Sequence, residues 1–349
     1  MDLDLTGLPR VVPRPVGEGV IPLIAVEGTA YECGRHYAQI VQEKYPGYRG
    51  FLEGNRDWLK LTPQTQRVVE QYAPHLPELF RGLIDGAGPQ SAPPAPPQEA
   101  GCTSFALHPS VTLDGIPISG QVKDTPPNRI PLYIILRMRI IGAPTIMVLA
   151  YPGELLGYGM WSTGMCRWRH DLYAKSGSRM PVLTPGVLPL LTLACHNVHQ
   201  AVELMEKYCG NSAGGCMLMD SSGQAVTCDS SISGLGLVWM KDGILTRSNH
   251  PESPLCRGDE QYPYPGFEAD SKYRTHGLRK LFEAESGRLT AQKAVQIMAD
   301  HSVYPRGQCK HWHDDGTVTT ALVLCEPSKG LMHVVRGQPC CNWPVTYTL

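Results

Sequence analysis

The sequence predicts an α+β protein built as a four-layer α/β/β/α sandwich of antiparallel sheets. Three observations favour this fold class. Segments with helical periodicity alternate with runs of short strand-like segments along the 349 residues. Turn signals such as Asp114-Gly115, Ser222-Gly223 and Asp242-Gly243 separate neighbouring strand segments, which is typical of antiparallel meanders. The sequence contains no repeat of 20 to 50 residues, which argues against a solenoid or a propeller.

The first third of the chain is predicted to be helical. Residues 29–85 carry two helical segments. The second has a clear start, with Thr62 as the N-cap and Pro63 at the first helical position. Pro74 and Pro77 interrupt its apolar pattern.

A change of composition then marks the end of this helical region. Residues 86–100 read GAGPQSAPPAPPQEA, which predicts a surface linker without regular structure. Residues 1–22 are also rich in proline and glycine and are predicted to form an extended lead-in. Directly after the linker, residues 101–107 (GCTSFAL) have the composition of a strand.

Strands and helices alternate over the rest of the chain. Helices are expected at residues 187–208, with Asn197 as an internal cap, at 271–284, and at 290–301 behind the N-cap Thr290. The further strands are predicted at 116–121, 132–140, 145–150, 216–220, 225–229, 236–240, 244–248, 319–325 and 331–335.

Composition excludes several classes of function. The chain has 31 basic and 32 acidic residues, so no excess of positive charge predicts nucleic acid or an anionic membrane as a partner. The start Met1-Asp2-Leu3-Asp4 lacks the basic and apolar regions of a secretory signal, and no run of about 18 apolar residues occurs. We therefore expect a cytoplasmic protein. Its twelve cysteines should then be free thiols, and most of them are expected to be small core residues.

One cysteine stands where a reaction is conceivable. Cys102 follows a flexible linker and Gly101 and opens a strand. Its thiol can attack the preceding carbonyl if the peptide is held tightly, which Gly101 permits because it lacks a Cβ. The freed α-amine, with an ordinary pKa of about 7.7–8.0, could then act as general base for the thiol. The alternative is a plain buried cysteine in a strand that follows a loop.

Several segments in the same order support the reactive interpretation. They resemble the penicillin acyltransferase (isopenicillin-N N-acyltransferase) family of autoprocessing cysteine N-terminal-nucleophile hydrolases. The segments are residues 25–38 (AVEGTAYECGRHYA), 101–104 (GCTS), 120–124 (GQVKD), 242–250 (DGILTRSNH), 299–301 (ADH), 309–311 (CKH) and 336–340 (RGQPC).

This resemblance implies a role for each of five residues. Cys102 would be the nucleophile of self-cleavage, after Gly101, and of catalysis. Asn249 would donate an amide N–H to the oxyanion, and Asp124 would orient the Cys102 amine or a nearby donor. Ser230 stands where the family has a functional serine, and Lys310 stands where it has an arginine.

Each of these residues also has a plainer interpretation. Asn249 could cap the loop before Pro251, and Asp124 could be an ordinary turn residue. Ser230 is one of several neighbouring serines, and Lys310 could be a solvated cation in a loop.

The sequence departs from the family's pattern at several positions. Lysine at 310 lacks the planar fork of arginine. Val122 and Trp161 replace expected asparagines, and Gly307 replaces a frequent serine. The helix-and-loop sequence that usually precedes the cleavage site is missing. These departures leave open a second hypothesis, an unprocessed and inactive relative that binds a small molecule or a partner.

The resemblance divides the chain at its cleavage site. Residues 1–101 would form a pro-segment, with the Pro/Ala-rich linker at 87–100, and residues 102–349 would form the catalytic segment. The two pieces should remain associated as one globular unit. The substrate would be a small-molecule amide or an acyl-CoA thioester, which leaves hydrolase and N-acyltransferase open, and no cofactor or metal is required.

Three other features of the sequence could also indicate a function. Residues 210–214 (GNSAG) match the G-x-S-x-G motif, but a nucleophile elbow needs a strand before it and a helix after it, which is the reverse of the predicted order. His196-x-x-His199 and His311-x-His313-Asp314-Asp315 resemble short metal motifs, yet loop solvation and core packing explain them better. Five aromatic residues could line an acyl or amine pocket or could simply pack at strand edges: Tyr151, Tyr158, Trp161, Trp168 and Tyr173.

Overall fold

The computed structural model of the chain describes residues 20–45, 62–87, 101–178, 183, 186–302, 307–311 and 316–349. Residues 88–100 of the predicted linker and most of the predicted lead-in at 1–22 lie outside these residues. The strands of the described residues are β1 (Leu23–Gly28), β2 (Gly101–Leu107), β3 (Ile118–Thr125), β4 (Ile134–Ile140), β5 (Ile146–Ala150), β6 (Tyr158–Trp161), β7 (Cys166–His170), β8 (Gly214–Met219), β9 (Ala225–Ser231), β10 (Gly234–Trp239), β11 (Ile244–Arg247), β12 (Val318–Glu326), β13 (Leu331–Arg336) and β14 (Val345–Thr348).

Both 3₁₀-helices and α-helices accompany the strands. The short 3₁₀ turns are η3 (Pro109–Val111), η4 (Pro127–Leu132) and η5 (Pro327–Lys329). The α-helices of the described residues are α1 (Ala30–Lys44), α3 (Pro63–Tyr72), α4 (Leu76–Ala87), α5 (Leu188–Ala194), α6 (Val198–Tyr208), α7 (Phe267–Ala284) and α8 (Ala291–Met298).

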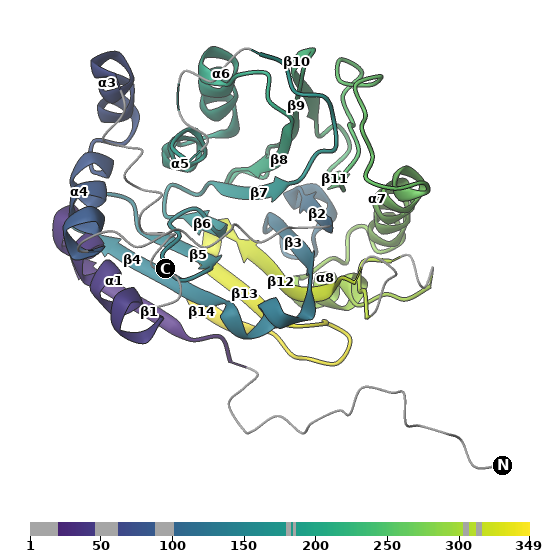
Figure 1. Ribbon diagram of the computed structural model, residues 1–349. Coiled ribbons are helices and arrows are strands. Elements are labelled where there is room, and N and C mark those ends of the chain that lie inside the picture. The colour runs from purple at the N-terminus through teal and green to yellow at the C-terminus, as the bar shows by residue number, and fades with distance from the viewer. Residues whose placement is uncertain are drawn as a thin grey trace.

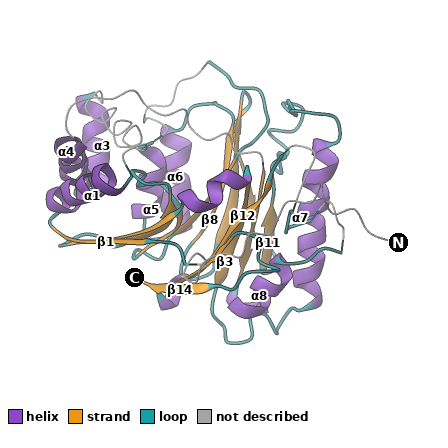
Figure 2. Cartoon of the chain, turned by 60° about the horizontal axis from the view of Figure 1, so that its bottom comes forward, coloured by secondary structure: helices purple, strands orange, loops and turns teal. Residues whose placement is uncertain are grey.

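Two stacked sheets form the centre of the molecule (Figure 1). The larger sheet has eight strands in the order β1-β4-β5-β6-β7-β8-β9-β10, and the smaller has six in the order β11-β2-β3-β12-β13-β14. Neighbouring strands pair antiparallel, except that β1 runs parallel to β4. Helices α1, α3, α4, α5 and α6 lie on one side of the paired sheets, and α7 and α8 lie on the other (Figure 2).

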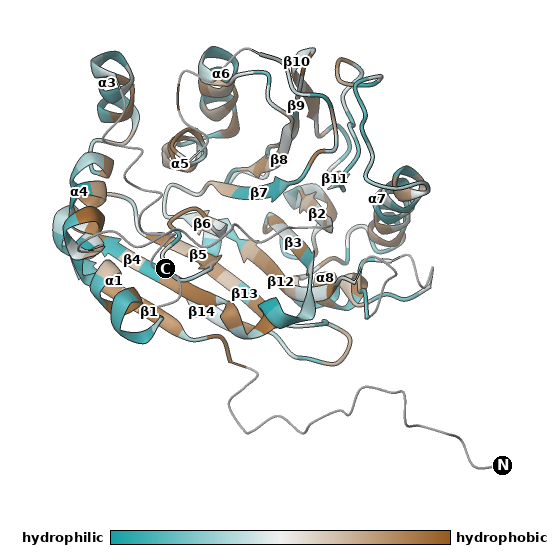
Figure 3. Ribbon diagram, in the orientation of Figure 1, coloured by the Kyte–Doolittle hydropathy of each residue, from teal (hydrophilic) through white to brown (hydrophobic). Residues whose placement is uncertain are grey.

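Three buried clusters hold these four layers together. Apolar side chains of the first five helices pack on the outer face of the eight-stranded sheet. A second cluster, which includes Trp168, Met217 and Val323, fills the space between the sheets. A third joins the six-stranded sheet to α7 and α8, with Phe105 against Phe282. Several strands are therefore buried on both faces and are apolar along most of their length (Figure 3). The α+β sandwich predicted from the sequence is confirmed.

The predicted helix starts agree with the structure where they were predicted from an N-cap residue. The Thr62 side chain accepts from the Thr65 N–H at 3.3 Å, and Pro63 is the first residue of α3. Thr290 caps α8 in the same way through the N–H of Lys293. Asn197 caps a new helix, α6, so the single helix expected over residues 187–208 is two helices.

Two boundaries in the N-terminal region were wrong. The helix that begins at Pro63 ends at Tyr72, and a separate helix begins at Leu76, because Pro74 has no N–H to continue the helical ladder. Gly86 and Ala87 are the last residues of α4 and not the start of the linker. Strands β6, β7 and β14 were missed because they are short, with four or five residues each.

None of the helices in the described parts of the chain combines the length and the apolar character that crossing a membrane requires.

Candidate active site

Cys102 is the second residue of β2, a strand in the interior of the six-stranded sheet. Its neighbours are β3 and β11, and its side chain is 1% exposed. The register pairs Cys102 with Lys123 of β3, so both side chains project from the same face of the sheet. Ala106, which lies four residues further along β2, packs between the two sheets. Because alternate residues of a strand share a face, the thiol of Cys102 also faces the space between the sheets.

The backbone of Cys102 is held on both sides by side chains from distant segments. Its N–H donates to Oδ1 of Asn249 at 3.0 Å. Its carbonyl oxygen accepts from Oγ of Ser248 at 3.0 Å and from Nη1 of Arg274 at 2.8 Å. The backbone N–H and carbonyl of Cys102, which follow the Gly101 carbonyl, are therefore both fixed by hydrogen bonds.

Asn249 lies just after β11 and is completely buried. Its backbone N–H donates to Oγ of Ser271, and its Nδ2 donates to the carbonyl of Asp171 at 2.9 Å. These contacts exclude the interpretation of Asn249 as a simple loop cap. An amide group has two N–H hydrogens, and Asp171 uses one of them, so one remains for the oxyanion role that the resemblance implies.

Asp124 lies in β3 opposite Gly101, so it is not the turn residue of the plainer interpretation. Its Oδ1 accepts from Oγ1 of Thr319 at 2.8 Å, and its Oδ2 has no hydrogen-bond partner among the residues that the structure describes. Burial raises the pKa of Asp124 above its ordinary value, and the charges of Lys310 and Arg274 oppose this shift.

Gly101 allows the close approach of this carboxylate. A Cβ placed on Gly101 would lie 3.3 Å from Oδ2 of Asp124 and 3.7 Å from Nζ of Lys310. The tight backbone conformation expected at Gly101 is not seen, because the residue lies in the extended strand β2 and does not have a positive φ. A side chain at this position would be tight against Asp124, whereas the backbone angle at Gly101 is open to other residues.

Lys310 is buried, with 2% of its surface exposed, so it is not a solvated loop cation. Its Nζ lies 3.9 Å from Oδ2 of Asp270. Its backbone N–H donates to Oγ1 of Thr319, and its carbonyl accepts from the backbone N–H of the same residue. Thr319 thus connects Lys310 to Asp124.

Arg274 of α7 joins these groups, and reasoning from sequence missed it. Its side chain is completely buried. Its Nε bonds to Oδ2 of Asp270 at 3.0 Å, and its Nη2 donates to Oδ1 of Asn249 at 3.0 Å. The signal was present in the sequence, because polar residues occupy the buried face of α7 at helical spacing: Asp270, Ser271, Arg274 and Thr275.

A second polar group lies between the sheets beside Cys102. Oγ of Ser104 is 2.6 Å from Nε2 of His170, and Arg247 forms a buried ion pair with Asp229. Burial lowers the pKa of His170 well below its ordinary value, and the charge of Arg247 adds to the shift. His170 is therefore a neutral imidazole near pH 7.

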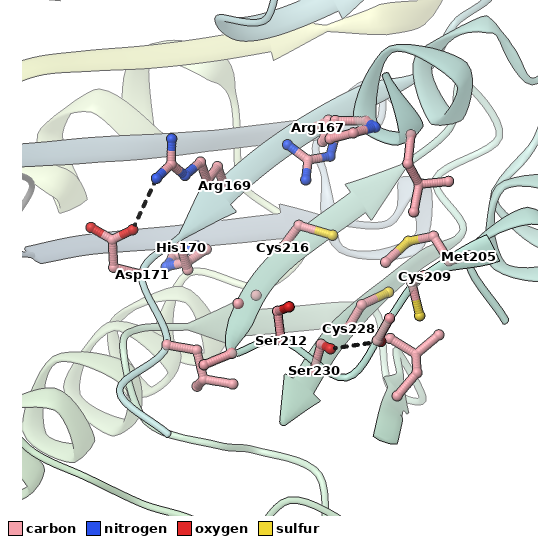
Figure 4. Close-up of a pocket in the computed structure, with 18 of the residues that line it drawn as sticks. Arg167, Arg169, His170, Asp171, Met205, Cys209, Ser212, Cys216, Cys228 and Ser230 are labelled. Carbon is pink, nitrogen blue, oxygen red and sulfur yellow. Dashed lines mark hydrogen bonds and ion pairs between the residues drawn. The ribbon is translucent and has the colours of Figure 1, made fainter. Parts of the chain in front are cut away.

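A cavity of about 410 Å³ lies between strands β7 to β9 and helices α5 and α6 (Figure 4). Cys102 does not line it. Two of the lining residues touch the surroundings of Cys102: Asp171 accepts from Asn249, and His170 contacts Ser104. The cavity is therefore connected to the surroundings of Cys102 through Asn249 and Ser104, although the thiol is not part of its wall.

Ser230 belongs to this cavity and not to the group around Cys102. Its Oγ donates to the carbonyl of Gly210 at 3.4 Å (Figure 4). The structure thus brings four of the predicted catalytic residues together with Gly101 and leaves the fifth, Ser230, among the cavity-lining residues. The four are Cys102, Asn249, Asp124 and Lys310.

The aromatic residues mostly serve packing. Tyr173 lines the cavity, whereas Trp161 is part of the core under the five helices. Tyr151 and Tyr158 pack between the sheets, where Nζ of Lys123 lies 3.6 Å from the centre of the Tyr158 ring. Trp168 is also between the sheets, and its indole donates to Oγ of Ser119.

A scan against protein-family models finds no match, and a search of the curated proteins finds none either. Among solved structures, two variants of conjugated bile acid hydrolase from Clostridium perfringens are similar, with TM-scores of 0.44 and 0.43. Each is 11% identical, and each alignment covers 71% of this chain and 97% of the other. Penicillin V acylase from Agrobacterium tumefaciens is 12% identical with a TM-score of 0.38, over 67% of this chain and 83% of the other.

Proposed function

We propose that this chain is an autoprocessing cysteine N-terminal-nucleophile enzyme that cuts itself between Gly101 and Cys102 and then acts on amide bonds. The observation that carries the proposal is the hydrogen bond from the Cys102 N–H to Oδ1 of Asn249 at 3.0 Å. This hydrogen bond holds the nitrogen of the Gly101–Cys102 peptide, which would be the leaving group during cleavage. The peptide is the first one of a buried strand. The same nitrogen would become the α-amine of the enzyme.

Self-cleavage would use only groups of this chain and water. The Cys102 sulfur attacks the carbonyl carbon of Gly101, the C–N bond breaks, and the nitrogen takes up a proton. The product is a thioester between Gly101 and Cys102, which water hydrolyses to a carboxylate and a free thiol. Oδ2 of Asp124, which is buried near Gly101 without a hydrogen-bond partner among the described residues, would accept a hydrogen bond from the new amine.

Turnover would then repeat the same chemistry on a substrate. The α-amine accepts the thiol proton as general base, and the sulfur attacks the substrate carbonyl. The substrate C–N bond then breaks, and the leaving amine takes up the proton held by the α-amine. Water hydrolyses the resulting thioester to a carboxylate and the free thiol. The remaining N–H of Asn249 would stabilise the oxyanion, a contribution typically worth about 10²–10³ in turnover. Burial raises the pKa of Asp124, and the positive charges of Lys310 and Arg274 would favour its charged form against that shift.

The cavity beside the site suits an acyl group with an apolar body. Leu172, Leu188 and Met205 line it, and Arg167 and Arg169 supply positive charge. A small-molecule amide would give an amidohydrolase, and interception of the acyl-enzyme by an amine, with an acyl-CoA thioester as donor, would give an N-acyltransferase. The substrates named for the structural neighbours, a conjugated bile acid and penicillin V, are reasonable first amides to assay.

A second candidate follows from the position of the cavity. Because Cys102 does not line it, the chain could hold a small molecule there as an uncut binding protein. Lysine instead of arginine at position 310 fits the same hypothesis.

A thiol-alkylating amide analogue separates the two candidates. An active enzyme should be labelled at Cys102 ahead of its other cysteines and should lose amidase activity in proportion. Cys325→Ala removes a different buried cysteine and should leave labelling unchanged. Labelling spread over the exposed Cys340 and Cys341, with none at Cys102, would contradict the enzyme proposal.

A further inference from the structure

Four metal-ligating side chains meet at one place in the described structure, outside the group around Cys102. They come from three segments: His301 follows α8, Cys309 and His311 lie in the segment 307–311, and Cys340 follows β13. One ligand atom from each residue lies within 4.8 Å of all the others. We call these four residues the Cys309 cluster.

The distances within the Cys309 cluster are close to those of a tetrahedral site. Nε2 of His311 is 2.9 Å from Sγ of Cys340 and 3.9 Å from Sγ of Cys309. Zn–S bonds of about 2.3 Å and Zn–N bonds of about 2.0–2.1 Å place neighbouring ligands about 3.4–3.8 Å apart in a tetrahedron. The observed distances lie on both sides of this range. The rings of His301 and His311 are also close, with centroids 5.0 Å apart.

We propose that the Cys309 cluster binds one Zn²⁺ ion. Two thiolates and two imidazoles are a donor set that favours zinc among the common divalent ions, and they supply the four ligands of a closed site. Such a site is structural, because it leaves no open position for water or substrate. No metal was predicted from the sequence, and the cluster forms no local motif, because Cys309 and Cys340 are 31 positions apart.

The position of Lys310 gives this site a consequence for the group around Cys102. Lys310 lies between two of the ligands, Cys309 and His311. A metal bound there would fix the segment that carries Lys310 against the segment that follows β13. The proposal itself is independent of the proposed function, because zinc binding does not require Cys102 to react.

Metal content measures the proposal directly. The full chain, purified under reducing conditions, loaded with Zn²⁺ and dialysed, should contain about one zinc per chain by inductively coupled plasma mass spectrometry. Cys309→Ser and His311→Gln should each reduce this at least tenfold. Cys341→Ser changes the neighbouring exposed cysteine outside the cluster, so it should keep one zinc per chain. Equal zinc in the wild type and in Cys309→Ser would overturn the proposal.

A cobalt spectrum tests the geometry without depending on the folding of a variant. Wild-type chain loaded with Co²⁺ should show the intense visible bands of tetrahedral cobalt and a sulfur-to-cobalt charge-transfer band. Weak octahedral bands without charge transfer would overturn the proposal. A mass two hydrogens lower, mapped to a Cys309–Cys340 disulfide in the reduced preparation, would also overturn it, because neither thiol would then be available to a metal.

Discussion

At the scale of single residues, Arg274 is the group on which the surroundings of Cys102 depend. It donates to the Cys102 carbonyl, to Thr103 and to Asn249, and it pairs with Asp270, all without contact with solvent. An isolated charge could not stay in such a place, so the pair with Asp270 is what allows the guanidinium to organise the site.

Removal of the Arg274 charge should therefore destabilise the fold strongly. Arg274→Met leaves Asp270 as a buried charge without its arginine, and breaking a buried pair in this way costs about 3–5 kcal/mol. Lys272→Met is the matched control on the same helix, because its pair with Glu268 is exposed and is worth about 0.5 kcal/mol or less. Urea unfolding measures both. A similar loss of stability in the two variants would contradict the account.

Asn249 should matter for chemistry as well as for stability, because its truncation leaves the buried partners of its side chain unpaired. Asn249→Ala removes the acceptor of the Cys102 N–H and the expected oxyanion donor, so amide turnover should fall by about 10²–10³. Asn197→Ala also truncates an asparagine, but this one caps α6 far from the thiol, so it should cost about 1 kcal/mol of stability and leave turnover unchanged. Equal turnover in the two variants would remove Asn249 from the mechanism.

The space at Gly101 gives a further prediction. In Gly101→Ala the new Cβ would lie 3.3 Å from Oδ2 of Asp124, a tight contact that either moves the carboxylate or distorts the peptide. Self-cleavage should slow severalfold while the fold persists. A time course of intact mass after synthesis in a cell-free system measures the rate. Cleavage at the wild-type rate would show that this contact is unimportant.

The sequence identified those candidate residues that stand in a distinctive local sequence context. Cys102 follows a linker and a glycine, and Asn249 precedes a histidine and a proline after a strand, so both are visible in one dimension. Arg274 and Thr319 act only because α7 and β12 bring them to β2 and β3. Such contacts depend on the packing of distant elements, which single-residue patterns do not contain.

At the scale of elements, α1 and α4 pack unusually closely because glycines face each other across their contact. A Cβ on Gly34 would lie 2.2 Å from the backbone oxygen of Leu79, and one on Gly82 would lie 2.0 Å from that of Tyr31. The two helices can therefore approach backbone to backbone, and α1 in turn packs against β1 and β4.

Two glycine-to-alanine changes in helices should therefore have opposite effects. Gly34→Ala forces α1 away from α4 and should destabilise the protein by about 1–3 kcal/mol. In Gly277→Ala the new Cβ in α7 meets no atom closer than 4.0 Å, so the better helix propensity should stabilise the protein by about 0.5–1 kcal/mol. Melting temperatures measure both. Shifts of the same sign would contradict this account of the packing.

Element boundaries were predictable where the chain carries its own signal. Thr62, Asn197 and Thr290 cap their helices through side-chain contacts with residues three positions ahead, so local sequence is sufficient. The short strands β6 and β7 are held by their neighbours in the sheet rather than by their own composition. A prediction from one segment at a time could not find them.

At the scale of the whole molecule, the described helices before Cys102 contribute side chains to the core. Tyr37, Leu79 and Phe80 pack in the same cluster as Leu136 and strands of the larger sheet. We therefore expect the two pieces to stay together after cleavage and to elute from gel filtration as one species of full mass. A separate small fragment under native conditions would contradict this expectation.

Buried histidines should make stability depend on pH. Burial lowers the pKa of His170 well below 6.5 and that of His75 to about 4. Unfolding restores ordinary pKa values, so the unfolded chain binds more protons as the pH falls below about 6.5. The stability due to neutral burial is thus fully present above about pH 6.5 and is lost as the pH falls towards 4.

The melting temperature of the wild type should fall over that pH interval. The melting temperature of His75→Gln should fall less steeply, because glutamine has no imidazole to bind a proton on unfolding. The change at exposed His196, His196→Gln, is the matched control. Parallel curves for wild type and His75→Gln would contradict the assignment.

The fold class itself could be predicted from the sequence, because runs of helices that alternate with runs of strands require a layered structure. The pairing of the strands into two sheets could be seen only in the structure.

Intact mass spectrometry of the purified wild-type chain, beside Cys102→Ala, shows whether the chain cuts itself. We expect two wild-type fragments, produced by cleavage between Gly101 and Cys102, and one uncut mass for Cys102→Ala. A single uncut mass for both chains would contradict self-processing and would favour the binding protein.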